Sequence, residues 1–416
     1  MKPAVKKIDE IYSANTLEAQ KMRYRTAECG FAEHFGTLGA HRFFSAPGRV
    51  EICGNHTTDA CGKAFAASID LDTIAVAEPT DDGFITIKSE GFPEEKISID
   101  DLDMKEEEKL TSAALIRGAL KGFKRNGYNI GGFKAYTTSK IIQNCGLGSS
   151  AAFEILIGTI ITHLFNNGQI RPATLAQIAR FAENEYFGKP SGLIDQVSCA
   201  VGGFVAIDFK DEDMPIIEEI RSDFSQYQHA LCIVNTGGKY GDFSKEYAEI
   251  QAEMKSIADY FDCSSLRQLA IEDITLNLKD LRDKFGDRAV LRSIHFFREN
   301  ERVEKIVHAL KNENFDGFLS SVRESGDSSF KYLQNIYTPT DVRHQPLSIA
   351  LNIAEGVLHR KGACRVHGSG YFGSMQAFVP LEDLQQFKMR MEKIFGVNSC
   401  HVLSVRSAGS CEVLLG

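Results

Sequence analysis

A loop of small residues runs directly into the longest apolar segment of the chain. The loop reads NCGLGSSAA (144–152), and the apolar segment extends from Ala151 to Phe165. This segment is too short to cross ~30 Å of hydrocarbon and contains Glu154 and His163, so we interpret it as a buried helix. The small-residue loop then forms the start of the helix, where backbone N–H groups are free and the helix dipole is positive.

Strand-like and helix-like segments follow one another irregularly in the rest of the sequence. Alternating, β-branched runs predict strands at 73–78, 84–88, 203–208, 231–235, 374–380 and 400–405. Apolar residues at helical spacing predict helices at 151–165, 174–187, 242–260, 302–310 and 347–359. Because no steady βαβα order is present, we expect an α+β fold and not a doubly wound parallel sheet.

The length of the chain, 416 residues, favours two domains over three at roughly 150 residues per domain. The best candidate for a linker is the polar, proline-terminated segment KDEDMP at 210–215. We therefore expect one domain over residues 1–209 and a second over residues 216–416.

The charge and the cysteine and histidine patterns argue against several kinds of partner and site. The net charge of −9 argues against sustained binding to nucleic acid or to an anionic membrane. The first fifteen residues lack the apolar core of a signal peptide. Ten cysteines without a CxxC pair and eleven histidines without an HExxH pair support neither a zinc site nor a disulfide framework. We expect a cytoplasmic protein with free thiols, no nucleic-acid partner and no membrane partner.

Three glycine-containing stretches carry the candidate chemistry. The loop at 144–152 suits a nucleotide phosphate, because small residues let the backbone approach an anion at a helix N-terminus; a plain Gly/Ser helix cap is the alternative. It matches neither the Walker A nor the Rossmann pattern. SAPGRVEICGNHTTD (45–59) predicts a Pro-Gly turn that presents Arg49, followed by polar side chains for a polyhydroxylated ligand, or else a turn with a structural arginine. VHGSGYFGS (366–374), between a helix and a strand, predicts a tight turn or a plain connector.

Taken together, the three stretches resemble the motifs of the GHMP kinase superfamily and, within it, of the galactokinases. The family forms are GRxNxIGEHTDY, GLSSSA and GGGFGG, and they align with residues 48–59, 146–151 and 368–373. Segments 187–211, 235–247 and 286–303 also resemble galactokinases of Gram-positive bacteria. The resemblance extends from about Arg42 to the C-terminus. It implies a two-domain GHMP kinase fold with mixed sheets and helices and an active site in the interdomain cleft.

The resemblance also assigns roles to individual residues. It implies that Asp195 accepts or orients the proton of the sugar hydroxyl, and that Arg49 keeps this carboxylate ionised and stabilises the phosphoryl group in flight. Ser150 and Glu183 would hold magnesium (Mg2+) through hard oxygen ligands. The residues implied for ATP are Asn144, Gly146, Leu147, Gly148, Ser149, Ser150 and Ala151. Those implied for the sugar are Asn55, His56, Thr58, Asp59, Gly192 and Tyr247.

Departures from the motifs fall mostly on the sugar side. Asn55 replaces the motif glutamate, as it does in related bacterial members with GNHTDH, and Thr58 replaces the motif aspartate, with Asp59 one residue later. Loss of a buried charged acceptor costs ~1.5–3 kcal/mol per hydrogen bond, so the change questions galactose but not the kinase chemistry. In the phosphate loop, Cys145 and Gly148 replace usual residues, while the magnesium serine is kept.

The expected activity is an ATP- and magnesium-dependent sugar 1-kinase that acts on galactose. Alternatives are a different hexose or hexose derivative, a non-catalytic sugar sensor, and, with less support, a mevalonate or homoserine kinase. We expect a monomer whose partners are the sugar and ATP.

Overall fold

Two β-sheets of unequal size organise the molecule, which is a computed structural model that describes residues 4–36, 39–143, 145–189, 191–211, 214–237, 243–371 and 373–416. The larger, mixed sheet has the order β1-β13-β2-β3-β6-β4-β5, with β7 on β3 and β8 on β7. The smaller sheet has the order β10-β11-β9-β12 and is antiparallel throughout. The strands of the larger sheet are β1 (Ala4–Lys7), β2 (Arg42–Cys53), β3 (Lys63–Thr80), β4 (Phe84–Ser89), β5 (Glu94–Ser98), β6 (Gly132–Ser139), β7 (Phe204–Asp208), β8 (Ile216–Ile220) and β13 (Cys411–Leu414). Those of the smaller sheet are β9 (His229–Asn235), β10 (Ala363–Val366), β11 (Ser374–Pro380) and β12 (Cys400–Leu403).

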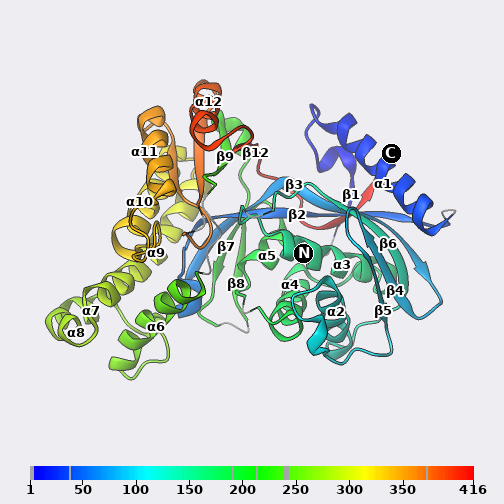
Figure 1. Ribbon diagram of the computed structural model, residues 1–416, viewed down its shortest axis with the longest axis horizontal. Coiled ribbons are helices and arrows are strands. Elements are labelled where there is room, and N and C mark those ends of the chain that lie inside the picture. Colours follow the sequence, from blue (N-terminus) through cyan, green and yellow to red (C-terminus); the bar gives the residue numbers. More distant parts are fainter. Residues whose placement is uncertain are drawn as a thin grey trace.

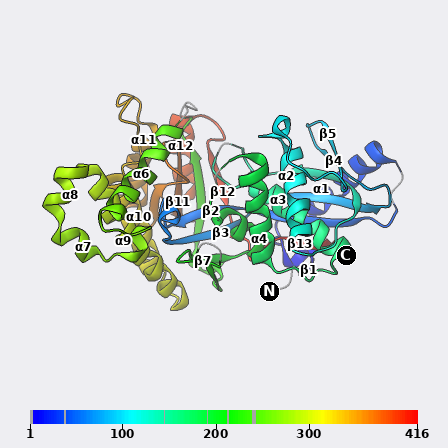
Figure 2. The same ribbon diagram turned by 90° about the horizontal axis from the view of Figure 1, so that it is seen from below.

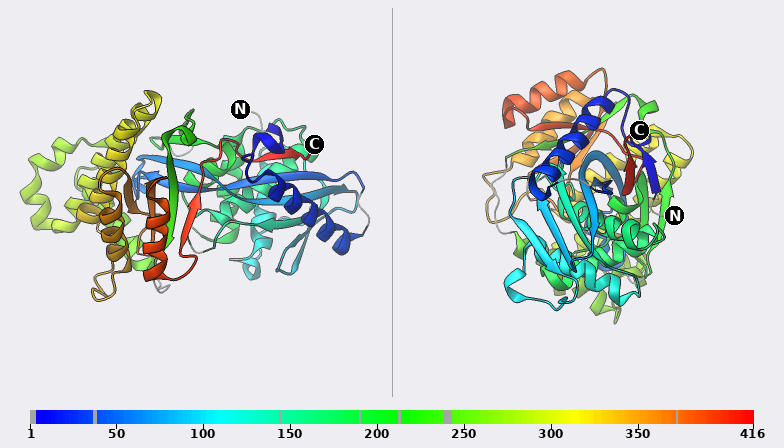
Figure 3. Two further views of the ribbon diagram at one scale, coloured as in Figure 1. Left: turned by 90° about the horizontal axis from the view of Figure 1, so that it is seen from above. Right: turned by 90° about the vertical axis from the view of Figure 1, so that its right-hand side faces the viewer.

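Helices cover both faces of the larger sheet. On one face lie α2 (Ser112–Arg125), α3 (Ser149–Phe165), α4 (Pro172–Phe181) and α5 (Ile194–Val201), and on the other lies α1 (Leu17–Phe35) (Figures 1 and 3). The apolar run forms α3, in which every residue from Ala151 to His163 except Phe153 is buried. This confirms the predicted buried helix.

A second group of helices surrounds the smaller sheet and extends to the far end of the molecule (Figure 2). Its members are α6 (Ser244–Tyr260), α7 (Ile271–Leu276), α8 (Leu278–Phe285), α9 (Asp287–Lys311), α10 (Phe315–Ser328), α11 (Pro346–Leu358) and α12 (Leu384–Phe395). Two π-helical turns continue α4 and α10, at Ala182–Phe187 and Ser329–Leu333. Short 3-10 helices lie at Ile8–Glu10, Thr58–Ala60, Glu106–Glu108, Phe224–Tyr227 and Leu266–Gln268.

The long strands β2 and β3 connect the two parts of the molecule (Figure 1). Near the end of β2, the side chain of Gln376 in β11 donates to the backbone carbonyl of Glu51 at 2.8 Å, and Arg365 in β10 donates to that of Ile52 at 2.9 Å. The division into 1–209 and 216–416 stays a prediction, and β8 and β13, which follow the expected linker, belong to the larger sheet.

The predicted strands and helices are all present, with shifted boundaries, whereas two local expectations are wrong. The expected Pro-Gly turn at 47–48 lies inside β2, where a register shift between Pro47 and Arg49 absorbs the irregularity without reversing the chain. The stretch 366–374 connects strands β10 and β11, not a helix and a strand. Within the described ranges, no helix is both long and apolar enough to cross a membrane.

Candidate active site

The phosphate loop has the backbone geometry that its glycines predict. Gly146 and Gly148 have φ values of +69° and +71°, a region that favours glycine, and α3 begins at Ser149. A Cβ on Gly148 would also lie 3.1 Å from Cγ of Arg49. Gly146 and Ser149 are exposed, so the loop presents backbone and hydroxyl groups at the positive end of a seventeen-residue helix.

Leu147 and Ala151 face the core beneath the phosphate loop, where both are buried. They shape the loop from behind, and only their backbone groups can reach a ligand. Asn144, which was also predicted to contact ATP, lies outside the described residues.

Arg49 joins this loop to the predicted catalytic carboxylate. Its Nε donates to Oδ1 of Asp195 at 2.7 Å and its Nη2 donates to Oδ2 at 2.6 Å. This two-point contact fixes the guanidinium and carboxylate groups relative to each other. Its Nη1 donates to the carbonyl of Gly146, and its backbone N–H donates to the carbonyl of Leu147 at 3.0 Å. The structure therefore brings Asp195, Arg49 and the phosphate loop together.

Asp195 stays ionised in this setting and remains accessible. Burial raises the pKa of its carboxyl group, but the charge of Arg49 and its hydrogen bonds outweigh that effect and hold the pKa below its ordinary value. The side chain of Arg49 is 9% exposed and that of Asp195 is 30% exposed. One carboxylate edge is thus covered by the arginine while the group still meets solvent.

Ser150 and Glu183 are adjacent, as a shared cation site requires. The hydroxyl of Ser150 donates to Oε1 of Glu183 at 3.2 Å, and the ammonium of Lys189 lies 3.0 Å from the same oxygen. Gln196 donates to Oε2 at 2.7 Å and orients the carboxylate. A hydroxyl and a carboxylate side by side suit a small, hard cation that keeps most of its water ligands, so these residues fit magnesium. No cluster of three or more His, Cys, Asp or Glu side chains suited to a metal occurs in the described part of the chain.

A buried carboxyl group lies beneath this pair. Glu154 of α3 is 2% exposed, and burial together with the nearby charge of Glu183 raises its pKa well above the ordinary value. Gln196 lies between the two, with its Nε2 3.4 Å from Oε2 of Glu154. A neutral Glu154 avoids an unpaired buried charge next to Glu183. The apolar pattern of α3 did not reveal this contact, because the partner comes from α5.

The glycine-rich connector between β10 and β11 supports the phosphate loop from the other side. Nε2 of His367 lies 2.9 Å from the carbonyl of Gly146, the carbonyl that also accepts from Arg49. Burial and the positive charge of Arg49 lower the pKa of His367 to about 3, so the ring is neutral and donates through Nε2. Sequence reasoning gave the connector no specific contact, because its partner is 221 positions away.

The predicted sugar-binding residues divide into two groups. Thr58 and Gly192 are partly or fully exposed and adjacent, since a Cβ on Gly192 would lie 3.6 Å from Oγ1 of Thr58. The ring of His56 stacks on that of Tyr247 with centroids 6.1 Å apart, and its Nε2 lies 2.9 Å from the carbonyl of Ser369. His56 and Tyr247 thus lie beside the connector, and Thr58 and Gly192 form a second accessible pair.

Asn55 and Asp59 are placed differently. Asn55 is 1% exposed and donates to Oε1 of Glu51 at 3.0 Å and to the carbonyl of Gly368 at 2.7 Å, so both amide hydrogens are bonded within the protein. Its own oxygen accepts from Asn335 at 2.7 Å. The side chain of Asp59 is exposed and lines a small pocket with α6.

Buried polar residues of α9 hold the sugar-side loop, and sequence reasoning missed them. Glu299 accepts from the backbone N–H of Gly54 at 3.0 Å, and His295 lies 2.9 Å from the backbone carbonyl of Asn55. Burial would raise the pKa of Glu299, but the charges of Arg302 and Arg365 and a hydrogen bond from Ser325 hold it far below its ordinary value. Their helical spacing on a buried face was the available signal, although it does not name the partner.

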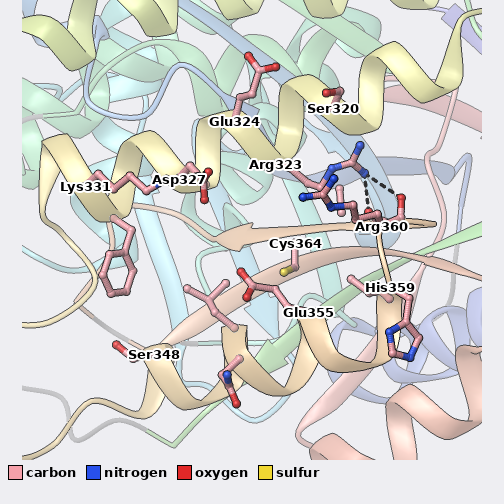
Figure 4. A pocket seen from close by; sticks show the side chains of 17 residues that line it. Ser320, Arg323, Glu324, Asp327, Lys331, Ser348, Glu355, His359, Arg360 and Cys364 are labelled. Carbon is pink, nitrogen blue, oxygen red and sulfur yellow. Dashed lines mark hydrogen bonds and ion pairs between the residues drawn. The ribbon is translucent and has the colours of Figure 1, made fainter.

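A separate surface depression lies away from these residues. It has a volume of about 750 Å³ and is open to solvent between α10 and α11 (Figure 4). Its charges are of both signs, and Arg323 is held there by the carbonyls of Arg360 and Gly362 at 3.3 and 2.7 Å. It shares no residue with the phosphate loop or with the Arg49–Asp195 pair.

Comparisons with known proteins match the regions that build this site. Residues 114–203 match the GHMP kinases N terminal domain, and residues 30–79 match the galactokinase galactose-binding signature. The chain is similar to the galactokinase of Lactococcus lactis subsp. lactis (strain IL1403), with 28% identity over 375 residues, 88% of this chain and 90% of that protein. It is similar to the galactokinase of Clostridium perfringens (strain 13 / Type A), with 29% identity over 88% of this chain and 92% of that protein.

A solved structure extends the comparison to the fold. The crystal structure of Lactococcus lactis galactokinase complexed with galactose has a TM-score of 0.77 to this chain at 24% identity. The match covers 94% of this chain and 99% of that one. The expected α+β fold is confirmed by this likeness.

Proposed function

This chain belongs to the galactokinase family of GHMP kinases, and on that premise we propose that it is an ATP-dependent sugar 1-kinase whose first substrate is galactose. The observation that carries the proposal is the contact of Arg49 with both Asp195 and the carbonyl of Gly146. This one side chain connects the acceptor side of a transfer reaction with the donor side.

In the proposed reaction, Asp195 holds the anomeric hydroxyl in line with the γ-phosphorus of ATP. The hydroxyl oxygen bonds to that phosphorus while the bond from phosphorus to the β–γ bridging oxygen breaks, and ADP leaves. The hydroxyl proton passes to Asp195 as the new bond forms. A carboxylate with a lowered pKa is a weak base, so orientation is its larger contribution and proton transfer comes late.

Arg49 has two roles in this scheme. Its fork keeps Asp195 ionised and fixed, and its remaining donor sits at the phosphate loop, where negative charge develops on the transferring group. The N-terminus of α3, with Ser149 and Ser150, provides the complementary positive potential for the triphosphate.

Ser150 and Glu183 would hold magnesium, which when bound supplies positive charge that neutralises the phosphate oxygens. Gln196 orients the Glu183 carboxylate through its 2.7 Å hydrogen bond. The ammonium of Lys189, whose side chain is 54% exposed, can move from Glu183 into solvent.

Galactose is the first choice because the relatives are named galactokinases and the similar crystal structure is described as complexed with galactose. A different hexose or hexose derivative is the second choice, and Thr58 motivates it. This residue stands where the family motif has aspartate, and it lies partly exposed beside Gly192.

The test is ADP release with Mg2+ and ATP over a panel of hexoses. The proposal expects turnover that depends on the sugar, is highest on galactose or one related hexose, and yields an acid-labile 1-phosphate. If another hexose is turned over and galactose is not, that hexose replaces galactose as the assigned substrate. No sugar-dependent ADP release on any member of the panel, or a stable 6-phosphate product, would contradict the proposal.

A further inference from the structure

One carboxylate on the sugar side has an accessible position that the motif comparison did not predict. Glu51 is the only residue from Phe44 to Cys53 of β2 that is not buried. Arg49 and Glu51 pair with β3 in regular register, opposite Ser68 and Ala66. Side chains two positions apart on a regular strand project to the same side, so Glu51 lies about 6.6 Å farther along the side that Arg49 occupies.

The carboxylate of Glu51 keeps one oxygen for a ligand. Its Oε1 accepts from Asn55 at 3.0 Å, and no other described residue hydrogen-bonds the group. Its Oε2 has no hydrogen-bond partner among the described residues, yet it is not a fully buried atom, so it meets solvent. Burial raises the pKa of Glu51, while the charges of Arg365, Arg49 and His56 and the Asn55 hydrogen bond oppose that rise.

Neither of the neighbouring polar residues Asn55 and Asp59 offers a free acceptor on the side that Glu51 occupies. Both amide hydrogens of Asn55 are bonded within the protein, and Asp59 faces the pocket beside α6. The family motif GRxNxIGEHTDY has asparagine where this chain has Glu51, and glutamate where it has Asn55. The chain therefore carries the same two side-chain types in exchanged order, joined by a hydrogen bond.

We propose that Glu51 is the sugar-recognition carboxylate of this site, which accepts hydrogen bonds from ring hydroxyls of the neutral hexose whose anomeric hydroxyl lies at Asp195. Asn55 positions Glu51 and bonds the connector at Gly368 instead of touching the sugar. This inference rests on the proposed function and adds a specificity residue to the same site.

The test combines a protein change with a substrate change. Glu51→Gln keeps the size of the side chain and an acceptor for Asn55 but removes the charge. We expect the KM for the sugar to rise about ten- to a hundredfold, while the KM for ATP stays within about twofold. Among singly deoxygenated sugars, one or two should lose about tenfold or more in kcat/KM with the unmodified protein, and Glu51→Gln should largely remove that same penalty.

The exchanged pair Glu51→Asn with Asn55→Glu is the second variant. It should recover sugar affinity relative to Glu51→Asn alone, because it returns a carboxylate to the motif position. Since the two residues share a hydrogen bond, a merely structural role predicts that the exchanged pair recovers melting temperature while its sugar KM stays as high as that of Glu51→Asn. Glu324→Gln, an exposed carboxylate in the separate depression, is the matched control and should leave every parameter unchanged. Melting temperature and the KM for ATP verify that each variant is folded.

The outcomes separate the two proposals. An unmodified protein without sugar-dependent ADP release contradicts the sugar 1-kinase itself. An active unmodified protein whose Glu51→Gln variant keeps the same sugar KM and the same deoxy-sugar penalties contradicts the role of Glu51 alone.

Discussion

The phosphate side and the sugar side of the site differ in how closely the observed contacts follow the family motifs. On the phosphate side, Gly148 has the backbone conformation that its sequence predicts, and Arg49 reaches Asp195 and Gly146 directly. On the sugar side, the predicted ligand Asn55 is buried in hydrogen bonds, and Glu51 is the accessible group instead.

The contrast follows from what each side has to do. The phosphate side binds the same triphosphate in every member of a kinase family, so helix-terminus geometry and one arginine satisfy the chemistry. The sugar side must match a particular pattern of hydroxyls, and that match can be built from several side chains as long as an acceptor faces each donor. We therefore expect motif transfer to serve better on the first side than on the second.

The largest expected effect tests the side on which the motifs and the geometry agree. Asp195→Asn keeps the size of the side chain but removes the charge that pairs with Arg49 and receives the proton. We expect kcat to fall about 10³–10⁴-fold, with ATP binding retained. ADP release measures the first quantity and nucleotide titration the second. Full activity of this variant would remove the basis for the catalytic assignment.

Arg49→Lys comes next in size. Lysine cannot provide the two-point contact to Asp195 and still reach the carbonyl of Gly146, so the acceptor and donor sides lose their connection. A decrease in kcat of about a hundredfold is expected, a size similar to the loss of one donor in other charge-stabilising sites. Arg323→Lys, in the separate depression, is the matched control and should be neutral. An Arg49→Lys enzyme with unchanged kcat would show that the fork geometry is unimportant.

A third change sharpens the phosphate side. Glu183→Gln removes one charged ligand of the expected magnesium site but preserves the contacts to Ser150 and Gln196. The magnesium concentration for half-maximal activity should rise about tenfold or more, while saturating magnesium restores part of kcat. Titration of ADP release with magnesium measures this shift. An unchanged magnesium requirement would place the cation elsewhere.

Thr58→Asp addresses the sugar side. This change restores the aspartate of the family motif beside Gly192, and a charged acceptor there is expected to raise kcat/KM for galactose about tenfold. The comparison is made against the preferred sugar of the unmodified protein. A loss of activity on galactose would show that the Glu51 arrangement and a second carboxylate at 58 are incompatible.

The last prediction concerns His295, which supports the sugar-side loop, and its expected effect is on stability more than on activity. Burial lowers the pKa of His295 to about 4 from an ordinary value near 6.5, so the unfolded chain binds more protons than the folded one between these values. The neutral histidine therefore contributes fully above about pH 6.5, and stability is lost as the pH falls towards 4, by about 3 kcal/mol in all. His295→Gln should flatten this part of the profile, as measured by urea unfolding at several pH values. An identical pH dependence of the variant would contradict the neutral, buried state.

Much of the fold and half of the site could be predicted because the signals are local. The apolar run of α3 and the glycines that precede it are signals within short segments. The resemblance associates Arg49 with Asp195 and Ser150 with Glu183, which the structure places in contact, while their roles stay predictions. The contacts of His367 with Gly146 and of Glu299 with Gly54 join residues 221 and 245 positions apart. The buried Asn55 is likewise bonded to Gly368 and Asn335, 313 and 280 positions away. The Pro-Gly turn failed for the same reason, since pairing of Pro47 with Asp72 and of Arg49 with Ser68 keeps this segment within β2.

The central claim is that one sugar hydroxyl and one phosphoryl group meet between Asp195 and the start of α3. A crystal structure of the complex with the preferred sugar, magnesium and a non-hydrolysable ATP analogue tests it most directly. We expect the anomeric oxygen within about 2.6–3.2 Å of the Asp195 carboxylate, in line with a γ-phosphate bound at the N-terminus of α3. A sugar that presents a different hydroxyl to Asp195, or a triphosphate bound away from α3, would contradict it.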